Sequence, residues 1–261
     1  MISGTPSQLW LGVFVCVWLA AAAQADCIPP SSLQPATLES VVDGDTLRLT
    51  DGRLVRLIGV NTPEIGRDGA PHQPYAVAAA RAVRQWLGKT VWLAPGHEPM
   101  DRYGRTLAAV YRDRDKKHLG EYLLQQGLGW QVSVPPNLRD VACLRAAELA
   151  ARRSERGVWR MPEILRAKSL TPADAGFKRV TGRVTRVSPS RRALWIELDS
   201  ALSLRLDKRD QVHFRGVDMQ SLVGQELTVR GWLIYRDRHR AQYPAHMMVL
   251  RHPAMLETDE E

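Results

Sequence analysis

Two Asp-Gly pairs, Asp43-Gly44 and Asp51-Gly52, divide residues 38–60 into short runs rich in Val, Leu and Ile. Such pairs favour the tight turns that join adjacent strands, because Gly and Asp tolerate the backbone conformations that these turns need. Residues 90–111 repeat this pattern around a Tyr-Gly pair. Both segments therefore predict short β-strands joined by tight turns.

Three segments have helical character: residues 75–88, 119–128 and 138–157. In the first, Ala and larger apolar residues recur at helical spacing, and a glycine marks its end. Strands, a helix, more strands and two further helices predict an α+β fold, a five-stranded β-barrel of the OB type with three packed helices. We place this domain at residues 26–160.

The pattern changes after residue 160. Residues 161–176 contain Pro and many polar residues and are interpreted as a linker. Residues 177–256 contain five alternating, strand-like segments without a helical period, which predicts a second small, mainly-β domain. An OB-like barrel is one interpretation of it. The last five residues, 257–261, read ETDEE and are interpreted as a solvated acidic tail.

The N-terminus indicates export. Residues 9–23 form an apolar run of the length found in signal peptides, and a small-x-small pattern predicts cleavage after Ala25. The alternative is an uncleaved membrane anchor, because residues 1–8 contain no Lys or Arg. The run is shorter than a typical membrane span of about 20 residues, so we expect a secreted or periplasmic protein.

Two cysteines, Cys27 and Cys143, remain after such cleavage, since Cys16 leaves with the leader. An even pair in an oxidising compartment is compatible with a disulfide. Two unpaired thiols are the alternative, because the sequence does not show whether the pair is close enough to bond.

Basic residues outnumber acidic ones, 36 Lys and Arg against 28 Asp and Glu, which gives a formal charge of +8. This balance favours phosphate-rich partners or anionic membrane surfaces without naming any chemistry. One basic residue is unusual: Arg56 lies within the apolar run LVRLIGV. A buried guanidinium is costly without an anionic partner, so Arg56 either turns to solvent or lines a site for a negative group.

Two short segments near Arg56 carry oxygen ligands. Asp43 and Asp45 flank a glycine, which allows two carboxylates to converge on a hard cation at a tight turn. Alone, the pair is compatible with an ordinary turn. The segment from Asn61 to Glu64 adds an amide oxygen, the Thr62 carbonyl and a carboxylate, held rigid by the intervening proline.

A third segment, DRYGR, places Arg105 just after a glycine turn, which suits bidentate contact with phosphate. Phosphodiester hydrolysis needs a base for water and cationic groups for the developing charge. The sequence therefore predicts Glu64 as general base and Arg56 and Arg105 as the catalytic arginines, beside a divalent cation.

The segments VVDGDTLRL, VRLIGVNTPE and DRYGRTLAAVY, followed by GVW at 157–159, resemble the thermonuclease or staphylococcal nuclease-like family over residues 38–160. The resemblance implies an OB-type barrel that cuts DNA and RNA with calcium and leaves 3′-phosphate ends. By position, Arg56, Glu64 and Arg105 match the family's catalytic residues. Asp45 and the Thr62 carbonyl match calcium ligands, with Asp43 as a nearby acidic partner.

This chain departs from the family pattern in two places. Asn61 stands where the best-known members carry a second aspartate ligand, which predicts a weaker metal site. In GWQVSVPPN, only Trp130 is aromatic where members often place tyrosines on the substrate. Trp130 is either a core residue or a platform for a base, and Arg102 and Tyr103 are further candidate substrate-binding residues.

Arginines also cluster in the second domain, where two interpretations stay open. They form either a basic groove for single-stranded nucleic acid, with Tyr235 and Trp232 nearby, or solvated charges on strand edges. The residues concerned are Arg183, Arg186, Arg191, Arg192 and the cluster at 236–240.

Three functions are compatible with the whole chain. We expect an exported, metal-dependent nuclease acting on DNA, RNA or both. The alternatives are a non-catalytic nucleic-acid-binding OB-fold protein, motivated by Asn61, and an interaction protein of the cell envelope.

Overall fold

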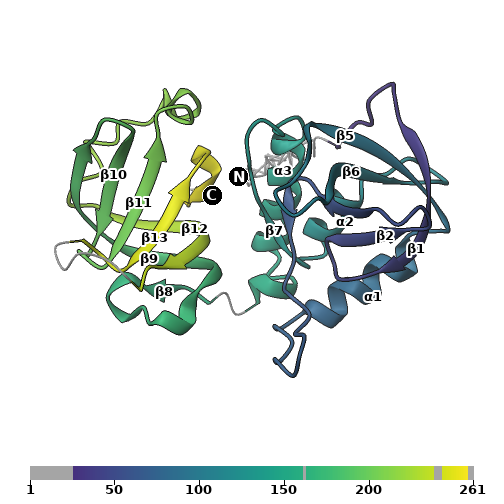
Figure 1. Ribbon diagram of the computed structural model, residues 1–261, viewed down its shortest axis with the longest axis horizontal. Helices are drawn as coiled ribbons and strands as arrows, with labels where there is room; N and C mark the ends of the chain where they lie inside the picture. Colours follow the sequence, from purple (N-terminus) through teal and green to yellow (C-terminus); the bar gives the residue numbers. More distant parts are fainter. Residues whose placement is uncertain (1–25, 161–162, 238–242, 258–261) are drawn as a thin grey trace, which may run out of the picture.

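The computed structural model describes residues 26–160, 163–237 and 243–257. The predicted signal peptide and its cleavage site lie outside these residues, as do positions 258–261. Figure 1 shows two β-barrel units side by side, with helix α3 and strand β7 on the side of the first unit that faces the second. Within the described ranges, no helix combines the length and the apolar character needed to cross a membrane.

The first unit is a closed barrel of five strands in the order β1-β2-β3-β6-β5. The third strand, β3, runs parallel to β6, and the other neighbours are antiparallel. A separate pair, β4 and β7, lies beside the barrel. The strands are β1 Gln34–Val41, β2 Thr46–Leu49, β3 Leu54–Leu57, β4 Val60–Asn61, β5 Thr90–Met100, β6 Thr106–Arg112 and β7 Trp130–Gln131.

Three α-helices pack against this barrel, as predicted: α1 Ala76–Trp86, α2 Leu119–Gln125 and α3 Val141–Arg153. A short 3-10 turn, η1, follows at Gly157–Trp159. The OB-type fold with three helices is therefore confirmed. The barrel leucines and valines share one core with the apolar faces of the helices, which removes their surface from water.

A disulfide joins Cys27 to Cys143 of α3, with Cα atoms 5.3 Å apart. It fastens the start of the described chain to the helix. Of the two alternatives for these cysteines, the bonded one is found.

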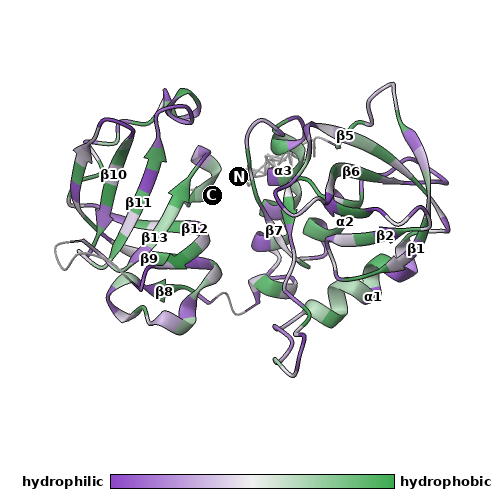
Figure 2. Ribbon diagram, in the orientation of Figure 1, coloured by the Kyte–Doolittle hydropathy of each residue, from purple (hydrophilic) through white to green (hydrophobic). Residues whose placement is uncertain are grey.

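The second unit is also a closed barrel, because β12 pairs with both β9 and β13. Figure 2 shows hydrophobic residues alternating with hydrophilic ones along its strands. The buried members form a core separate from that of the first barrel. Its strands are β9 Gly176–Pro189, β10 Ala193–Leu198, β11 Leu202–Asp207, β12 Glu226–Tyr235 and β13 His246–Leu250.

The two barrels share one strand topology. In each, the first three strands form an antiparallel meander, and the third strand runs parallel to the fifth. The fourth strand then closes the barrel against the first. The predicted second β-domain is confirmed, and its strand order is that of the first barrel.

The segment predicted as a linker contains regular structure. Within the predicted linker, β8 (Leu165–Arg166) pairs in parallel with β9, and two 3-10 turns follow, η2 (Ala167–Ser169) and η3 (Pro172–Asp174). Strand β8, inside the predicted linker, therefore extends the second sheet beside β9.

The interpretation of Glu257 as part of a solvated tail was wrong. Glu257 lies in β14 (Leu256–Glu257), is only 8% exposed, and accepts a hydrogen bond of 2.7 Å from Nε of Arg179. Ion pairing with a buried arginine explains why this carboxylate is inside.

Two short 3-10 turns complete the second unit: η4 (Gln211–Phe214) and η5 (Pro253–Met255).

Candidate active site

The acidic turn between β1 and β2 packs closely against Thr62, just after β4, and against helix α1. A Cβ atom at Gly44 would lie 2.7 Å from both Thr62 Oγ1 and Ala79 Cβ, so only glycine fits this approach. Asp43 and Asp45 are both buried, with 5% and 2% of their surface exposed. The turn therefore holds two carboxylates inside the protein, beside Thr62.

The guanidinium of Arg56 faces this turn rather than solvent. Its Nη2 lies 3.1 Å from Asp45 Oδ2 and donates to Asn61 Oδ1 at 3.0 Å. Its Nη1 donates to the carbonyl oxygens of Leu57 and Val60 at 2.8 and 2.6 Å. With 11% of the side chain exposed, Arg56 is a nearly buried cation with an anionic partner, as one of the two alternatives predicted.

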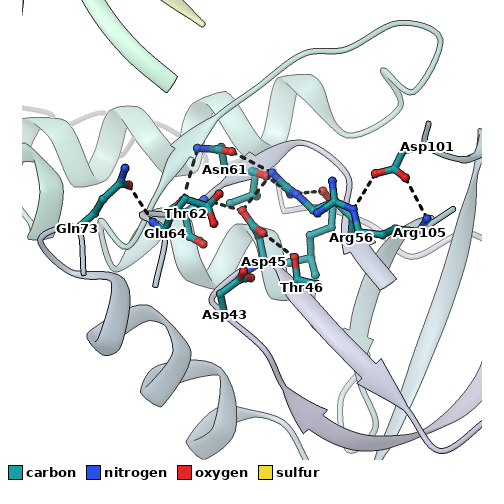
Figure 3. A network of polar contacts seen from close by, with 12 residues as sticks. Asp43, Asp45, Thr46, Arg56, Asn61, Thr62, Glu64, Gln73, Asp101 and Arg105 are labelled. Atoms are coloured by element: carbon teal, nitrogen blue, oxygen red, sulfur yellow. Dashed lines mark hydrogen bonds and ion pairs between the residues drawn. The ribbon is translucent and has the colours of Figure 1, made fainter. Parts of the chain in front are cut away.

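Asp45 connects the turn to the segment just after β4. Its Oδ2 accepts a hydrogen bond of 2.8 Å from the backbone N–H of Thr62, and its Oδ1 accepts one of 3.1 Å from Thr46 Oγ1. Figure 3 shows Asp43, Asp45, Thr62 and Glu64 gathered on one side of Arg56. The predicted residues of the first two motifs thus form one cluster.

Glu64 lies at the exposed rim of this cluster. Its backbone N–H donates to Gln73 Oε1 at 2.8 Å, which fixes the chain just after Pro63. Partial burial raises the pKa of the Glu64 carboxyl, and the negative charge of Asp45 adds to this effect. Arg56, Arg67 and Arg105 oppose the rise, so all three guanidinium groups act electrostatically on Glu64.

Negative charge is concentrated around Asp43. Burial raises the pKa of Asp43 to about 6, and the charges of Asp45 and Glu64 contribute to the rise. Neighbouring carboxylates repel each other unless protons or a cation neutralise them.

Arg105 approaches the cluster from the other side of Arg56 (Figure 3). Asp101 fixes it: Oδ1 accepts from the Arg105 backbone N–H at 2.9 Å, and Oδ2 accepts from its Nε at 2.7 Å. Tyr103 is 68% exposed, and the guanidinium carbons of Arg102 and Arg105 lie 4.7 and 5.6 Å from its ring centroid. This turn therefore presents two arginines and an exposed ring at the edge of the site.

Trp130 lies in β7, directly opposite Asn61 of β4. It is half-buried, packs on a small core that includes Val158 and Trp159, and its ring centroid lies 5.4 Å from that of Phe177. These contacts give Trp130 the surroundings of a core residue at the junction of the two barrels.

Two contributors to the site were not predicted. Gln73 holds the backbone of Glu64, but a single glutamine in a polar loop carries no sequence signal. Glu148 of α3 accepts a hydrogen bond of 2.6 Å from the backbone N–H of Gln131, in the strand that pairs with β4. For Glu148, the sequence signal that could have indicated this role was a charged residue within the apolar pattern of α3.

Comparisons with known proteins agree with this arrangement. The family described as staphylococcal nuclease homologue matches residues 54–161. The thermonuclease of Staphylococcus intermedius is 35% identical over 126 residues, which cover 47% of this chain and 74% of that protein. The chain belongs to the staphylococcal nuclease family.

Two further family relatives extend the comparison. The thermonuclease of Staphylococcus hyicus is 33% identical over 123 residues, 46% of this chain and 72% of that protein. The SPbeta prophage-derived endonuclease YokF of Bacillus subtilis is 32% identical over 133 residues, 49% of this chain and 44% of that protein. The family match ends at residue 161, so the second barrel lies outside it.

Proposed function

We propose that this protein is an exported nuclease that hydrolyses phosphodiester bonds of DNA, RNA or both with the help of a divalent cation. The observation that carries the proposal is the cluster of Arg56, Asp45 and Glu64, with Arg105 at its edge. Family membership and relatives named thermonuclease and endonuclease support it.

In the proposed reaction, a water oxygen attacks phosphorus and the bond to the leaving ester oxygen breaks. Glu64 takes the proton from this water, for which a raised pKa makes it a stronger base. Arg56 and Arg105 donate hydrogen bonds to the phosphate oxygens and stabilise their growing negative charge. Arg56 is well prepared for this role because carbonyls and Asp45 already fix its orientation.

The donor set fits a divalent cation in kind. Asp43 and Asp45 would hold it with the Thr62 carbonyl, and all of these are oxygen ligands of the type calcium prefers. Burial raises the pKa of Asp43, and the negative charges of Asp45 and Glu64 add to the rise; a cation would relieve this repulsion. Such a cation would supply charge for the phosphate oxygens.

The positions of the side chains limit which residues can be assigned as ligands of the cation. Among the described residues, no three His, Cys, Asp or Glu side chains surround a common point. Asn61 points its amide oxygen at Arg56, so its role as a ligand stays a prediction. Calcium is the cation that we propose.

Export is part of the proposal. The Cys27–Cys143 disulfide supports an oxidising compartment, because such bonds are rare in the reducing cytosol. N-terminal sequencing of the protein recovered outside the cytoplasm tests cleavage after Ala25. An N-terminus at Met1 would contradict it.

Cleavage assays test the enzyme itself. The purified protein is incubated with single-stranded DNA and with RNA, with calcium or with a chelator. We expect calcium-dependent cleavage that falls by about two to three powers of ten in Arg56→Ala and is lost in Glu64→Gln. The control variants Arg114→Ala and Glu39→Gln change exposed groups away from the site and should cleave normally.

A different result would favour the alternative function. Salt-sensitive binding without cleavage in calcium, magnesium or manganese would exclude the nuclease and leave a nucleic-acid-binding protein.

A further inference from the structure

The second barrel carries an arginine at a place comparable to that of Arg56. Arg56 lies on the third strand, β3, opposite Thr46 of β2 and beside the parallel strand β6. Arg205 lies on the third strand of the second barrel, β11, opposite Trp195 of β10 and beside the parallel strand β13. Each arginine projects outward, because the residues before and after it are buried in the barrel.

An open pocket surrounds Arg205. Its guanidinium carbon lies 6.0 Å from the ring centroid of Trp195, whose Nε1 donates to Ser190 Oγ at 3.3 Å. The β9–β10 turn adds Arg191 and Arg192, both exposed. The pocket is lined by Ser190, Arg191, Arg192, Ala193, Trp195 and Arg205.

The charges of this pocket are mostly uncompensated. Arg205 is paired with Asp207 at 2.6 Å, whereas Arg191 and Arg192 form no ion pair with any residue that the structure describes. The lining contains no carboxylate, in contrast to the cluster around Glu64. It can therefore attract a phosphodiester, but it offers no base to activate water.

We propose that this pocket is a second binding site for single-stranded nucleic acid, which holds a strand without cleaving it. The inference rests on the proposed function, in which nucleic acid is the substrate. Arginines bind phosphate oxygens through paired N–H groups, and an indole ring stacks on an unpaired base. A strand held there would raise the local concentration of substrate at the first barrel.

Binding is measured by fluorescence anisotropy of a labelled oligothymidylate with the full chain carrying Glu64→Gln, in chelator and over a range of salt concentrations. The same chain with Arg56→Ala added isolates the second site. In this background we expect Arg191→Ala/Arg192→Ala to weaken binding and to reduce the salt slope by about 1.4. We expect Trp195→Ala to weaken it roughly 5- to 150-fold at an unchanged slope.

The matched control is Arg166→Ala/Lys168→Ala, which removes the same charge from exposed positions in β8 and in the 3-10 turn after it, away from the β9–β10 turn. It should bind like its parent. Equal losses in both double variants would overturn the proposal, because they would indicate attraction by net charge alone. Absence of binding in every chain carrying Arg56→Ala would also overturn it.

These outcomes differ from failure of the proposed function. If the proposed function fails, the unaltered protein does not cleave nucleic acid. The anisotropy experiment measures binding by the Glu64→Gln chain in chelator, so its result does not depend on cleavage.

Discussion

Arg230 of the second barrel reaches into the first and forms an ion pair with Glu148 of α3, with Nη1 and Oε2 2.7 Å apart. Both side chains are nearly buried, with 7% and 6% exposed. Glu148 also accepts from the Gln131 backbone, and β7 pairs with β4, whose Val60 carbonyl accepts from Arg56. A continuous set of contacts therefore joins the second barrel to the candidate catalytic arginine.

We expect Arg230→Met to lower the free energy of unfolding by about 3 to 5 kcal/mol, because Glu148 is left buried and unpaired. The double variant Arg230→Met/Glu148→Gln should recover much of this loss, since glutamine carries no charge and keeps an acceptor for Gln131. Urea denaturation measures both. Arg152→Met, which removes a longer ion pair to Glu257 at 3.8 Å, is the control. If Arg230→Met lowers the free energy of unfolding no more than Arg152→Met does, the Arg230–Glu148 ion pair is not important for stability.

Asp101 is expected to act through Arg105. Asp101→Asn removes the charged acceptor of Arg105 Nε and lets the guanidinium move, which should lower kcat by up to about 100-fold. Direct loss of Arg105 should cost about two to three powers of ten. Asp115→Asn, which breaks a comparable pair with Arg112, is the control and should leave cleavage unchanged. Unchanged kcat in Asp101→Asn would mean that Arg105 needs no such support.

Asn61→Asp should tighten calcium binding, because it adds a negative charge beside Asp45 and keeps an oxygen for Arg56. We expect the calcium concentration for half-maximal cleavage to fall on the order of tenfold. Gln34→Glu adds the same charge at an exposed position on β1 and should leave this concentration unchanged. An unchanged value in Asn61→Asp would place the cation away from residue 61.

Glu257 should make stability depend on pH. Burial opposes its ionisation, but the hydrogen bonds and charge of Arg179, with the charges of Arg230 and Arg152, keep its pKa below the ordinary 4.5. As the pH falls, Glu257 therefore takes up a proton at a higher pH in the unfolded chain than in the folded protein. The contribution of the ionised Glu257 to stability is fully present above pH 4.5 and is lost as the pH falls through the folded pKa.

Urea denaturation of the unaltered protein and of Glu257→Gln between pH 7 and pH 3 checks this expectation. The difference in free energy of unfolding between them should shrink below pH 4.5. A constant difference over the whole range would contradict it.

Loss of the disulfide should destabilise the protein. Cys27 and Cys143 are separated by 116 positions, and closing a loop of this size stabilises by about 2 to 5 kcal/mol. We expect Cys27→Ser/Cys143→Ser to lose this amount in urea denaturation, and a reducing agent to have the same effect on the unaltered protein. A reducing agent should have no effect on the double variant. Equal stability with and without reductant in the unaltered protein would refute a structural role.

The sequence by itself determined the local elements and much of the site. Asp-Gly turns, alternation and helical spacing predicted both barrels and three helices, because these signals come from residues adjacent in the chain. The unusual position of Arg56 within an apolar run indicated an anionic partner, and Asp45 lies there. Glu257 was misinterpreted because its partner, Arg179, lies 78 positions away.

Only the tertiary structure decided how distant parts combine. The common strand order of the two barrels depends on which strands pair, and pairing is fixed by packing over the whole sheet. The same holds for Arg230 and Glu148: each is an ordinary charged residue in its own segment, and burial at the junction makes them a pair. Ion pairs between remote segments depend on three-dimensional proximity, which sequence spacing does not encode.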